Sequence, residues 1–123
     1  MVVGLGIDLA PIGAFGDDGR RGRFTERCFT AGEREYTASR GVAAAQSAAG
    51  IFAAKESALK AFAAGIGDIP LTDIETLRAP SGAPSLVFHG EAARRAHALG
   101  VTRVHLSITH QGDYAAAVVI LEA

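Results

Sequence analysis

The feature that most constrains this chain is a long alanine-rich segment, residues 41–64, that contains no proline. It holds eleven alanines, and alanine has the highest helix propensity of all residues. Gly65 and Gly67 follow directly, and glycine is typical of a helix end. We therefore predict one long helix from Gly41 to Ala64, against which the rest of the chain has to pack.

Composition limits what such a chain can be. It has 123 residues, 49% of them hydrophobic, which suits one domain spanning residues 1–123. Twelve basic and thirteen acidic residues give a net charge of -1, which argues against a nucleic-acid or membrane-surface binder. Cys28 is the only cysteine, which excludes an internal disulfide and a cysteine zinc site. The opening MVVGLGIDLA lacks a basic n-region and is too short to cross a bilayer, so we expect a cytoplasmic protein.

The remaining pattern predicts an α+β fold. Thr30 and Glu33 have the spacing of a capping box, which starts a helix over Ala31–Ser39. After the long helix the hydrophobic period changes to that of strands, so a largely antiparallel sheet should pack on the long helix. The other expected elements are a strand at Val2–Leu9 buried on both faces, a helical turn at Ala10–Phe15, a loop at 16–22, strands at Thr72–Arg78, Ser85–His89, Val101–Thr109 and Tyr114–Leu121, and a helix at Glu91–Leu99.

The long helix carries charges where a core-facing helix should be apolar. At about 100° per residue, one apolar stripe holds Ile51, Phe52, Leu59, Phe62 and Ile66. Lys55 projects into that stripe, while Glu56 and Lys60 lie side by side at its edge, four residues apart. One interpretation is an ordinary surface pair, with Lys55 extending its charged end to water. The other is a functional site.

Asp8 favours the functional interpretation. An aspartate at the end of an apolar strand carries a desolvation cost unless something pairs with it. Mg²⁺ needs only one or two protein carboxylates and completes its shell with water and substrate phosphates. Asp8 and Glu56 would meet that need, and Lys60, one turn on, could lie against a phosphate. The structural alternative for Asp8 is a helix N-cap ahead of Pro11.

The segment SITHQGDYAAAVVIL, residues 107–121, ends one strand at His110 and begins another. A histidine beside a turn is commonly a packed or hydrogen-bonded residue, so a catalytic role is only one possibility for His110. The other histidines, His89, His97 and His105, are scattered and show no metal-ligand spacing.

Together these segments resemble the holo-(acyl-carrier-protein) synthase family of 4′-phosphopantetheinyl transferases. The matching stretches follow the family's order: GIDLAPI (6–12), FTERCFTAGEREY (24–36), FAAKESALKAF (52–62), the GAP turn (82–84) and SITH…AAAVVI (107–120). The early G-I-D paired with F-x-x-K-E-x-x-x-K is specific, whereas each piece alone would be weak.

The resemblance implies transfer of phosphopantetheine from coenzyme A to a serine of an acyl carrier protein, with release of adenosine 3′,5′-bisphosphate. It implies that Asp8 and Glu56 hold Mg²⁺, with Asp8, Glu56, Lys60 and His110 catalytic. Coenzyme A contacts are implied for Lys60, Gly82, Pro84, Thr109 and His110. The resemblance also implies a homotrimer with each active site between two subunits.

Three positions depart from the family's pattern. Residues 13–15 lack a usual arginine that grips the acidic carrier, for which Arg20, Arg21 and Arg23 could substitute. Ile51 stands where an arginine commonly precedes FAAKE, and Gln111 replaces an aspartate that some relatives offer as a base. These losses leave two alternatives to the enzyme: a non-catalytic module that binds coenzyme A or a carrier protein, and a purely structural trimer subunit.

Overall fold

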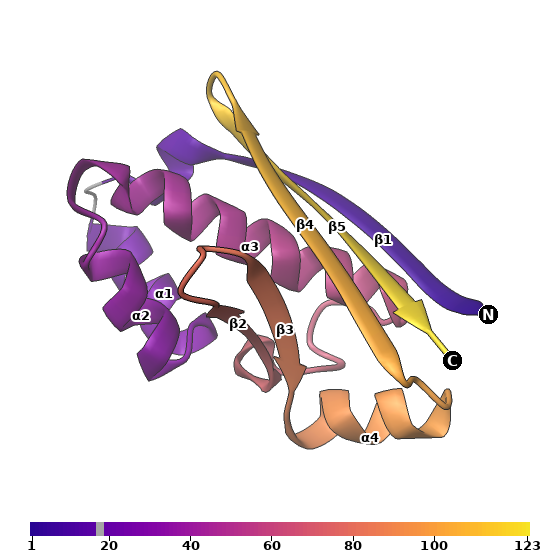
Figure 1. The fold of residues 1–123 in the computed structure, drawn as a ribbon. Coiled ribbons are helices and arrows are strands. Elements are labelled where there is room, and N and C mark those ends of the chain that lie inside the picture. Colours follow the sequence, from indigo (N-terminus) through magenta and orange to yellow (C-terminus); the bar gives the residue numbers. More distant parts are fainter. Residues whose placement is uncertain (17–18) are drawn as a thin grey trace.

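The computed structural model describes residues 1–16 and 19–123, with only the backbone for residues 19–22. Figure 1 shows a long central helix, α3, with a three-stranded sheet on one side and shorter helices and a second sheet on the other. The elements in chain order are β1 (Val2–Pro11), η1 (Ile12–Phe15), α1 (Gly19–Cys28), α2 (Ala31–Ala38), η2 (Gly41–Ala43), α3 (Ala44–Ala61), η3 (Leu71–Asp73), β2 (Ile74–Arg78), β3 (Pro84–Phe88), α4 (Gly90–Ala98), β4 (Arg103–Gln111) and β5 (Tyr114–Glu122).

Both sheets are antiparallel. The larger has the strand order β1-β5-β4, and the smaller pairs β2 with β3. The α+β class and the antiparallel sheet on one long helix are therefore confirmed. No helix among the described residues has the length and apolar composition needed to span a bilayer.

The long helix exists but is shorter than predicted at both ends. A 3₁₀ turn occupies Gly41–Ala43, and the α-helix itself ends at Ala61. The end is a Schellman motif: the Ala64 N–H donates to Leu59 O and the Ala63 N–H to Lys60 O. Ala63 takes the left-handed conformation, with φ of 54°. Glycine usually fills that position, which explains why Gly65 misled the prediction.

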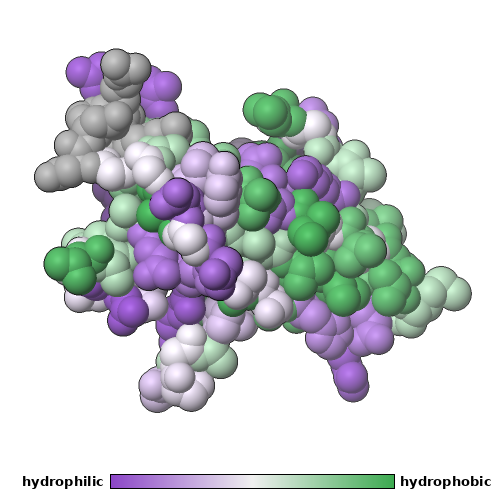
Figure 2. All heavy atoms as spheres, turned by 90° about the horizontal axis from the view of Figure 1, so that it is seen from above, coloured by the Kyte–Doolittle hydropathy of each residue, from purple (hydrophilic) through white to green (hydrophobic). Residues whose placement is uncertain are grey.

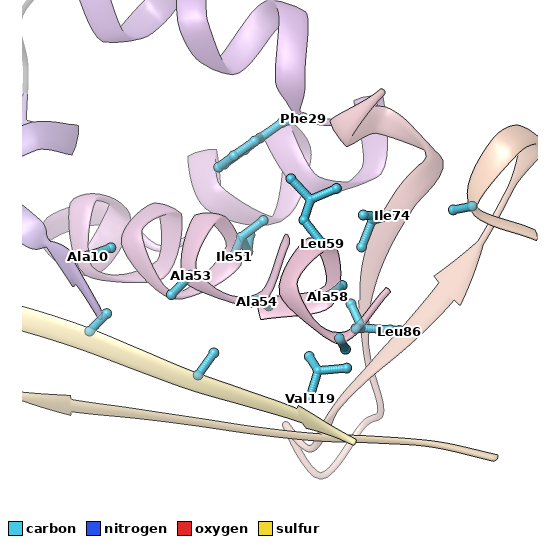
Figure 3. Close-up of a cluster of buried hydrophobic side chains, with 14 of the residues drawn as sticks. Ala10, Phe29, Ile51, Ala53, Ala54, Ala58, Leu59, Ile74, Leu86 and Val119 are labelled. Atoms are coloured by element: carbon cyan, nitrogen blue, oxygen red, sulfur yellow. The ribbon is translucent and has the colours of Figure 1, made fainter. Parts of the chain in front are cut away.

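The core lies along α3, and small side chains make it compact. Ala49, Ala53, Ala54 and Ala58 are all fully buried, so neighbouring elements approach the helix closely (Figure 3). Larger side chains from other elements complete this cluster, among them Phe29, Ile74, Leu86 and Val119. The alanines that favour the helix thus also set its packing distance.

The prediction that the first strand is buried on both faces is wrong. β1 is an edge strand, and Leu5, Ile7 and Leu9 are 63%, 66% and 62% exposed. Gly4 and Gly6 alternate with them and face α3. A Cβ at Gly6 would lie 1.8 Å from the Ser57 carbonyl oxygen, so the glycines allow direct backbone contact between β1 and the helix.

Two further predictions concern the region before α3. The capping box is confirmed, because the Thr30 side chain accepts from the Glu33 N–H and the Glu33 carboxylate accepts from the Thr30 N–H. The loop expected at 16–22 is wrong in part, since α1 begins at Gly19. Phe24 of α1 packs against Phe52, with ring centroids 5.3 Å apart, and this tertiary contact is not visible in the local sequence.

Candidate functional site

Asp8, Glu56 and Lys60 come together where β1 crosses α3. The Lys60 Nζ lies 3.3 Å from Asp8 Oδ1 and donates to the Ile7 carbonyl oxygen at 2.9 Å. The Lys60 side chain is 56% exposed and that of Asp8 is 16% exposed. They open onto a hollow of ≈ 480 Å³ lined by Ile7, Asp8, Leu9, Lys60 and Ala116. The N-cap alternative for Asp8 does not apply, because Asp8 lies inside β1, paired with Ala117.

The electrostatics of this group favour a bound cation. Burial raises the pKa of the half-buried Glu56, the Asp8 charge raises it further, and Lys60 lowers it. Two carboxylates therefore repel one another beside a single ammonium group. A divalent cation between them would relieve that repulsion and stabilise both as carboxylates.

The donor set fits Mg²⁺ and fits zinc poorly. Among the described residues, no group of three or more His, Cys, Asp or Glu side chains is arranged to hold a metal ion. Zinc sites usually have three or four such ligands. Mg²⁺ is commonly held by one or two carboxylates, with water and phosphate oxygens as its other ligands, which is what Asp8 and Glu56 can supply.

His110 does not join this group within one chain. Its Nε2 lies 3.2 Å from the carbonyl oxygen of Gln46, near the start of α3. Since a carbonyl only accepts, Nε2 carries the hydrogen, and a neutral His110 has its lone pair on Nδ1. The absence of a side chain at Gly50 makes room for the ring, because a Cβ there would lie 3.2 Å from Nε2.

Apart from Lys60, the other predicted coenzyme A contacts lie on the same side as His110. β4, which carries Thr109 and His110, is the edge strand opposite β1, with β5 between them. Gly82 is in the turn before β3 and Pro84 begins that strand, which packs beside β4 (Figure 1). The predicted residues thus form two groups: Asp8, Glu56 and Lys60 at β1, and Gly82, Pro84, Thr109 and His110 towards β4.

Lys55 does not extend its charged end to water, as the surface interpretation of this segment would have it. Its side chain is fully buried, and its Nζ pairs with Glu33 Oε1 at 2.8 Å. Burial lowers the pKa of Lys55, and the Glu33 charge opposes that shift. The sequence signal was present, because Lys55 falls in the apolar stripe, but its partner Glu33 was recognised only as a helix cap.

The arginines proposed to grip the carrier are only partly visible. Arg23 is exposed on α1, whereas the side chains of Arg20 and Arg21 lie outside the described residues. Their part in carrier docking stays a prediction.

Comparison with known proteins gives one consistent family. The model of the 4′-phosphopantetheinyl transferase superfamily matches residues 4–119. A holo-[acyl-carrier-protein] synthase from Nitratidesulfovibrio vulgaris strain DP4 is 48% identical, with 100% of both chains covered. One from Koribacter versatilis is 42% identical, with 99% of each covered.

Solved structures agree with the sequence comparison. The crystal structure of a holo-(acyl-carrier-protein) synthase from Bacillus anthracis, in complex with CoA (3′,5′-ADP), has a TM-score of 0.81 and 34% identity, and covers 100% of this chain and 98% of that one. An ACPS–CoA complex from Chronobacterium ammoniagenes has a TM-score of 0.82 and 30% identity, with 97% and 96% covered.

Proposed function

Because this chain belongs to the holo-[acyl-carrier-protein] synthase family of the 4′-phosphopantetheinyl transferase superfamily, we propose that it modifies an apo acyl carrier protein in the cytoplasm. It transfers 4′-phosphopantetheine from coenzyme A to a carrier serine, with Mg²⁺, and releases adenosine 3′,5′-bisphosphate. The observation that carries this proposal is the contact of Lys60 with Asp8 at an open hollow, with Glu56 close enough for both charges to act on its carboxyl group.

Each residue of the group has a role that its geometry supports. Asp8 and Glu56 would hold Mg²⁺, which when bound supplies positive charge to the pyrophosphate of coenzyme A. Lys60, already oriented by Ile7 and Asp8, neutralises phosphate charge as it develops in transfer. Phosphoryl transfer depends mostly on such positioning and charge stabilisation.

The transfer also needs a proton acceptor. The serine oxygen attacks the phosphorus next to pantetheine, the bond from that phosphorus to the bridging pyrophosphate oxygen breaks, and the serine proton has to leave. Glu56 is the candidate acceptor on this chain, because its half-buried carboxylate lies beside Asp8 and Lys60 at the proposed site. Gln111 cannot take that proton.

The second group of residues suggests a site shared between chains. Gly82, Pro84, Thr109 and His110 lie towards β4, with β5 between that strand and Asp8 on β1. A neighbouring copy could bring its own set to the hollow beside Asp8. Ile7 and Leu9 of β1 line the hollow, and together with Leu5 they offer an exposed apolar contact surface. We therefore propose a homotrimer in which coenzyme A binds between Asp8 of one chain and His110 of the next.

A transfer assay tests the metal pair. Purified protein is incubated with Mg²⁺, coenzyme A and an apo carrier, and the carrier's intact mass is measured. We expect Asp8→Ala and Glu56→Ala to abolish the mass increase and to keep the fold, since each removes charge rather than core volume. Glu35→Ala, at an exposed acid on α2, is the control. Near-normal turnover of either site variant at limiting Mg²⁺ would refute the metal assignment.

A further inference from the structure

Glu56 has a buried polar residue on each side of it in the sequence. Lys55 and Ser57 are both 0% exposed, whereas the Glu56 side chain is only partly buried at the edge of α3. Neighbours on a helix point in directions about 100° apart, so Lys55 and Ser57 face different flanks of α3. Their hydrogen bonds therefore attach α3 to its neighbours on two different flanks, one on each side of Glu56 in the sequence.

Lys55 uses its whole hydrogen-bonding capacity on the flank away from the larger sheet. Its Nζ donates to the carbonyl oxygens of Leu71 at 2.7 Å and Ile74 at 2.5 Å, and pairs with Glu33 Oε1 at 2.8 Å. An ammonium group has three hydrogens to donate, and three acceptors take them. One atom thereby ties α3 to η3, to the start of β2 and to α2.

Glu33 is itself immobilised. Its Oε1 accepts from the Thr30 N–H and its Oε2 from the Thr76 N–H, each at 2.8 Å. Because Glu33 caps α2 and also contacts β2, it cannot follow a movement of Lys55 without breaking these bonds. The Lys55–Glu33 pair is thus a fixed point for α3.

The sheet flank of α3 is held in a different way. Ser57 Oγ donates to the Ala117 carbonyl oxygen at 2.9 Å, and Ala117 is the residue paired with Asp8 across the ladder. The backbone contacts at Gly4 and Gly6 hold the same flank without any side chain. Loss of the Ser57 hydroxyl therefore leaves that flank in place. On the opposite flank, Lys55 supplies the polar contacts by which α3 is held in the described part of the chain.

We propose that Lys55, held by Glu33, is a positioning residue that fixes the rotation of α3 and so directs the Glu56 carboxylate towards Asp8. This inference rests on the proposed function, in which Glu56 and Asp8 share a metal ion. Residues that orient metal ligands typically change metal affinity by 10–100-fold when they are replaced. We expect an effect of about tenfold here.

The test measures metal binding directly, with Mn²⁺ as a paramagnetic substitute for Mg²⁺. Free Mn²⁺ is followed by electron paramagnetic resonance during titration of the protein with coenzyme A present. We expect Lys55→Met to raise the Mn²⁺ dissociation constant about tenfold. Lys55→Gln has a side chain one bond shorter that still donates hydrogen bonds, so its dissociation constant should lie between those of the wild type and Lys55→Met. Trimethylamine N-oxide is added throughout because it favours the folded state.

Two controls separate positioning from simple destabilisation. Ser57→Ala removes the other buried neighbour of Glu56 and should keep the wild-type affinity. Leu86→Ala lowers the melting temperature through a core cavity on β3 and should also keep it. Wild-type Mn²⁺ affinity in both Lys55 variants would overturn the inference. So would a loss of Mn²⁺ affinity in Leu86→Ala equal to that in the Lys55 variants at matched melting temperature. Either result would leave the proposed function standing. Failure of the wild type to bind Mn²⁺ would remove the proposed metal site and the inference with it.

Discussion

At the scale of single residues, Lys60 is the clearest case of a charge placed for use. Its ammonium group contacts Asp8 and the Ile7 carbonyl oxygen, yet the side chain remains 56% exposed. A surface ion pair of this kind contributes little to stability. The same geometry holds a positive charge at the rim of the hollow, where an incoming phosphate would meet it.

We therefore expect Lys60→Ala to slow transfer by a factor of about 10² and to weaken coenzyme A binding. The melting temperature should change little, because the lost ion pair is exposed. Initial rates and calorimetric titration with coenzyme A would measure both effects. Arg94→Ala, which removes an exposed cation of α4, serves as the control. Unchanged kinetics in Lys60→Ala would exclude its proposed role.

At the scale of elements, the contact between β1 and α3 sets the geometry of the site. Asp8 is two residues beyond Gly6, whose Cα faces the Ser57 carbonyl oxygen at a distance that excludes a Cβ. Backbone atoms therefore decide how closely the strand approaches the helix. That spacing in turn sets how far Asp8 lies from Glu56 and Lys60.

Gly6→Ala should push β1 away from α3. We expect a loss of about 1–3 kcal/mol in the free energy of unfolding, measured by urea denaturation, together with a loss of transfer activity. Gly13→Ala is the matched control, because among the described residues no atom beyond its chain neighbours and the backbone of η1 lies within 4 Å of its added Cβ. Equal stability of the two variants would contradict the close backbone contact.

The start of α2 offers a second test at this scale, and it depends on pH. Thr30 Oγ1 accepts from the Glu33 N–H and donates to Glu75 Oε2 at 2.7 Å. The Thr30 hydroxyl is the largest cause of the lowered pKa of Glu75, followed by the hydrogen bond from His89. A carboxyl with a lowered pKa adds stability above its unfolded value of 4.5, and that stability disappears as the pH falls through the folded value.

We expect Thr30→Ala to lower the free energy of unfolding by about 1–2 kcal/mol at neutral pH. The difference in this free energy between the variant and the wild type should become smaller below pH 4.5. Thr30→Ser keeps both hydrogen bonds and should remain close to the wild type. Denaturant unfolding between about pH 3 and 7 shows whether the stability difference falls or rises as the pH is lowered. These limits bracket the ordinary pKa of a carboxyl group, about 4. A gap that widens in acid would rule out the Thr30–Glu75 contribution.

At the scale of the whole molecule, one face is more apolar than the fold requires. Leu5, Ile7 and Leu9 of β1 point away from α3 and are exposed. Figure 2 shows an apolar area on the side of the molecule along which β1 runs in Figure 1. Contiguous apolar surface of this kind marks protein contacts, in line with the proposed trimer.

Leu5→Glu should convert the trimer to monomers and remove most of the transfer activity, although Leu5 does not line the hollow. Leu77→Glu, at an exposed leucine of β2, should do neither. Sedimentation velocity and the transfer assay measure the two effects.

Mixing tests the same arrangement without changing the contact surface. Asp8→Ala and His110→Ala proteins, refolded together, should recover activity in about a quarter of the sites if each site draws on two chains in a closed ring. No recovery would place each site within one chain.

Short-range features of this protein follow from the sequence alone. The alanine-rich helix, the capping box at Thr30 and Glu33 and the alternation of the last strands depend on residues a few positions apart, so their signals survive without a structure. The family resemblance singled out Asp8, Glu56 and Lys60, and the structure brings these three together although β1 and α3 are far apart in the chain.

Only the tertiary structure decided which of these residues are buried, and with what partners. Lys55 is fully buried because Glu33, Leu71 and Ile74 converge on it, and the apolar side chains of β1 are exposed because β1 is an edge strand. The separation of His110 from Asp8 depends likewise on strand order, with β5 between them. Burial and partnership are set by distant segments packing together, and a local pattern carries no record of that packing.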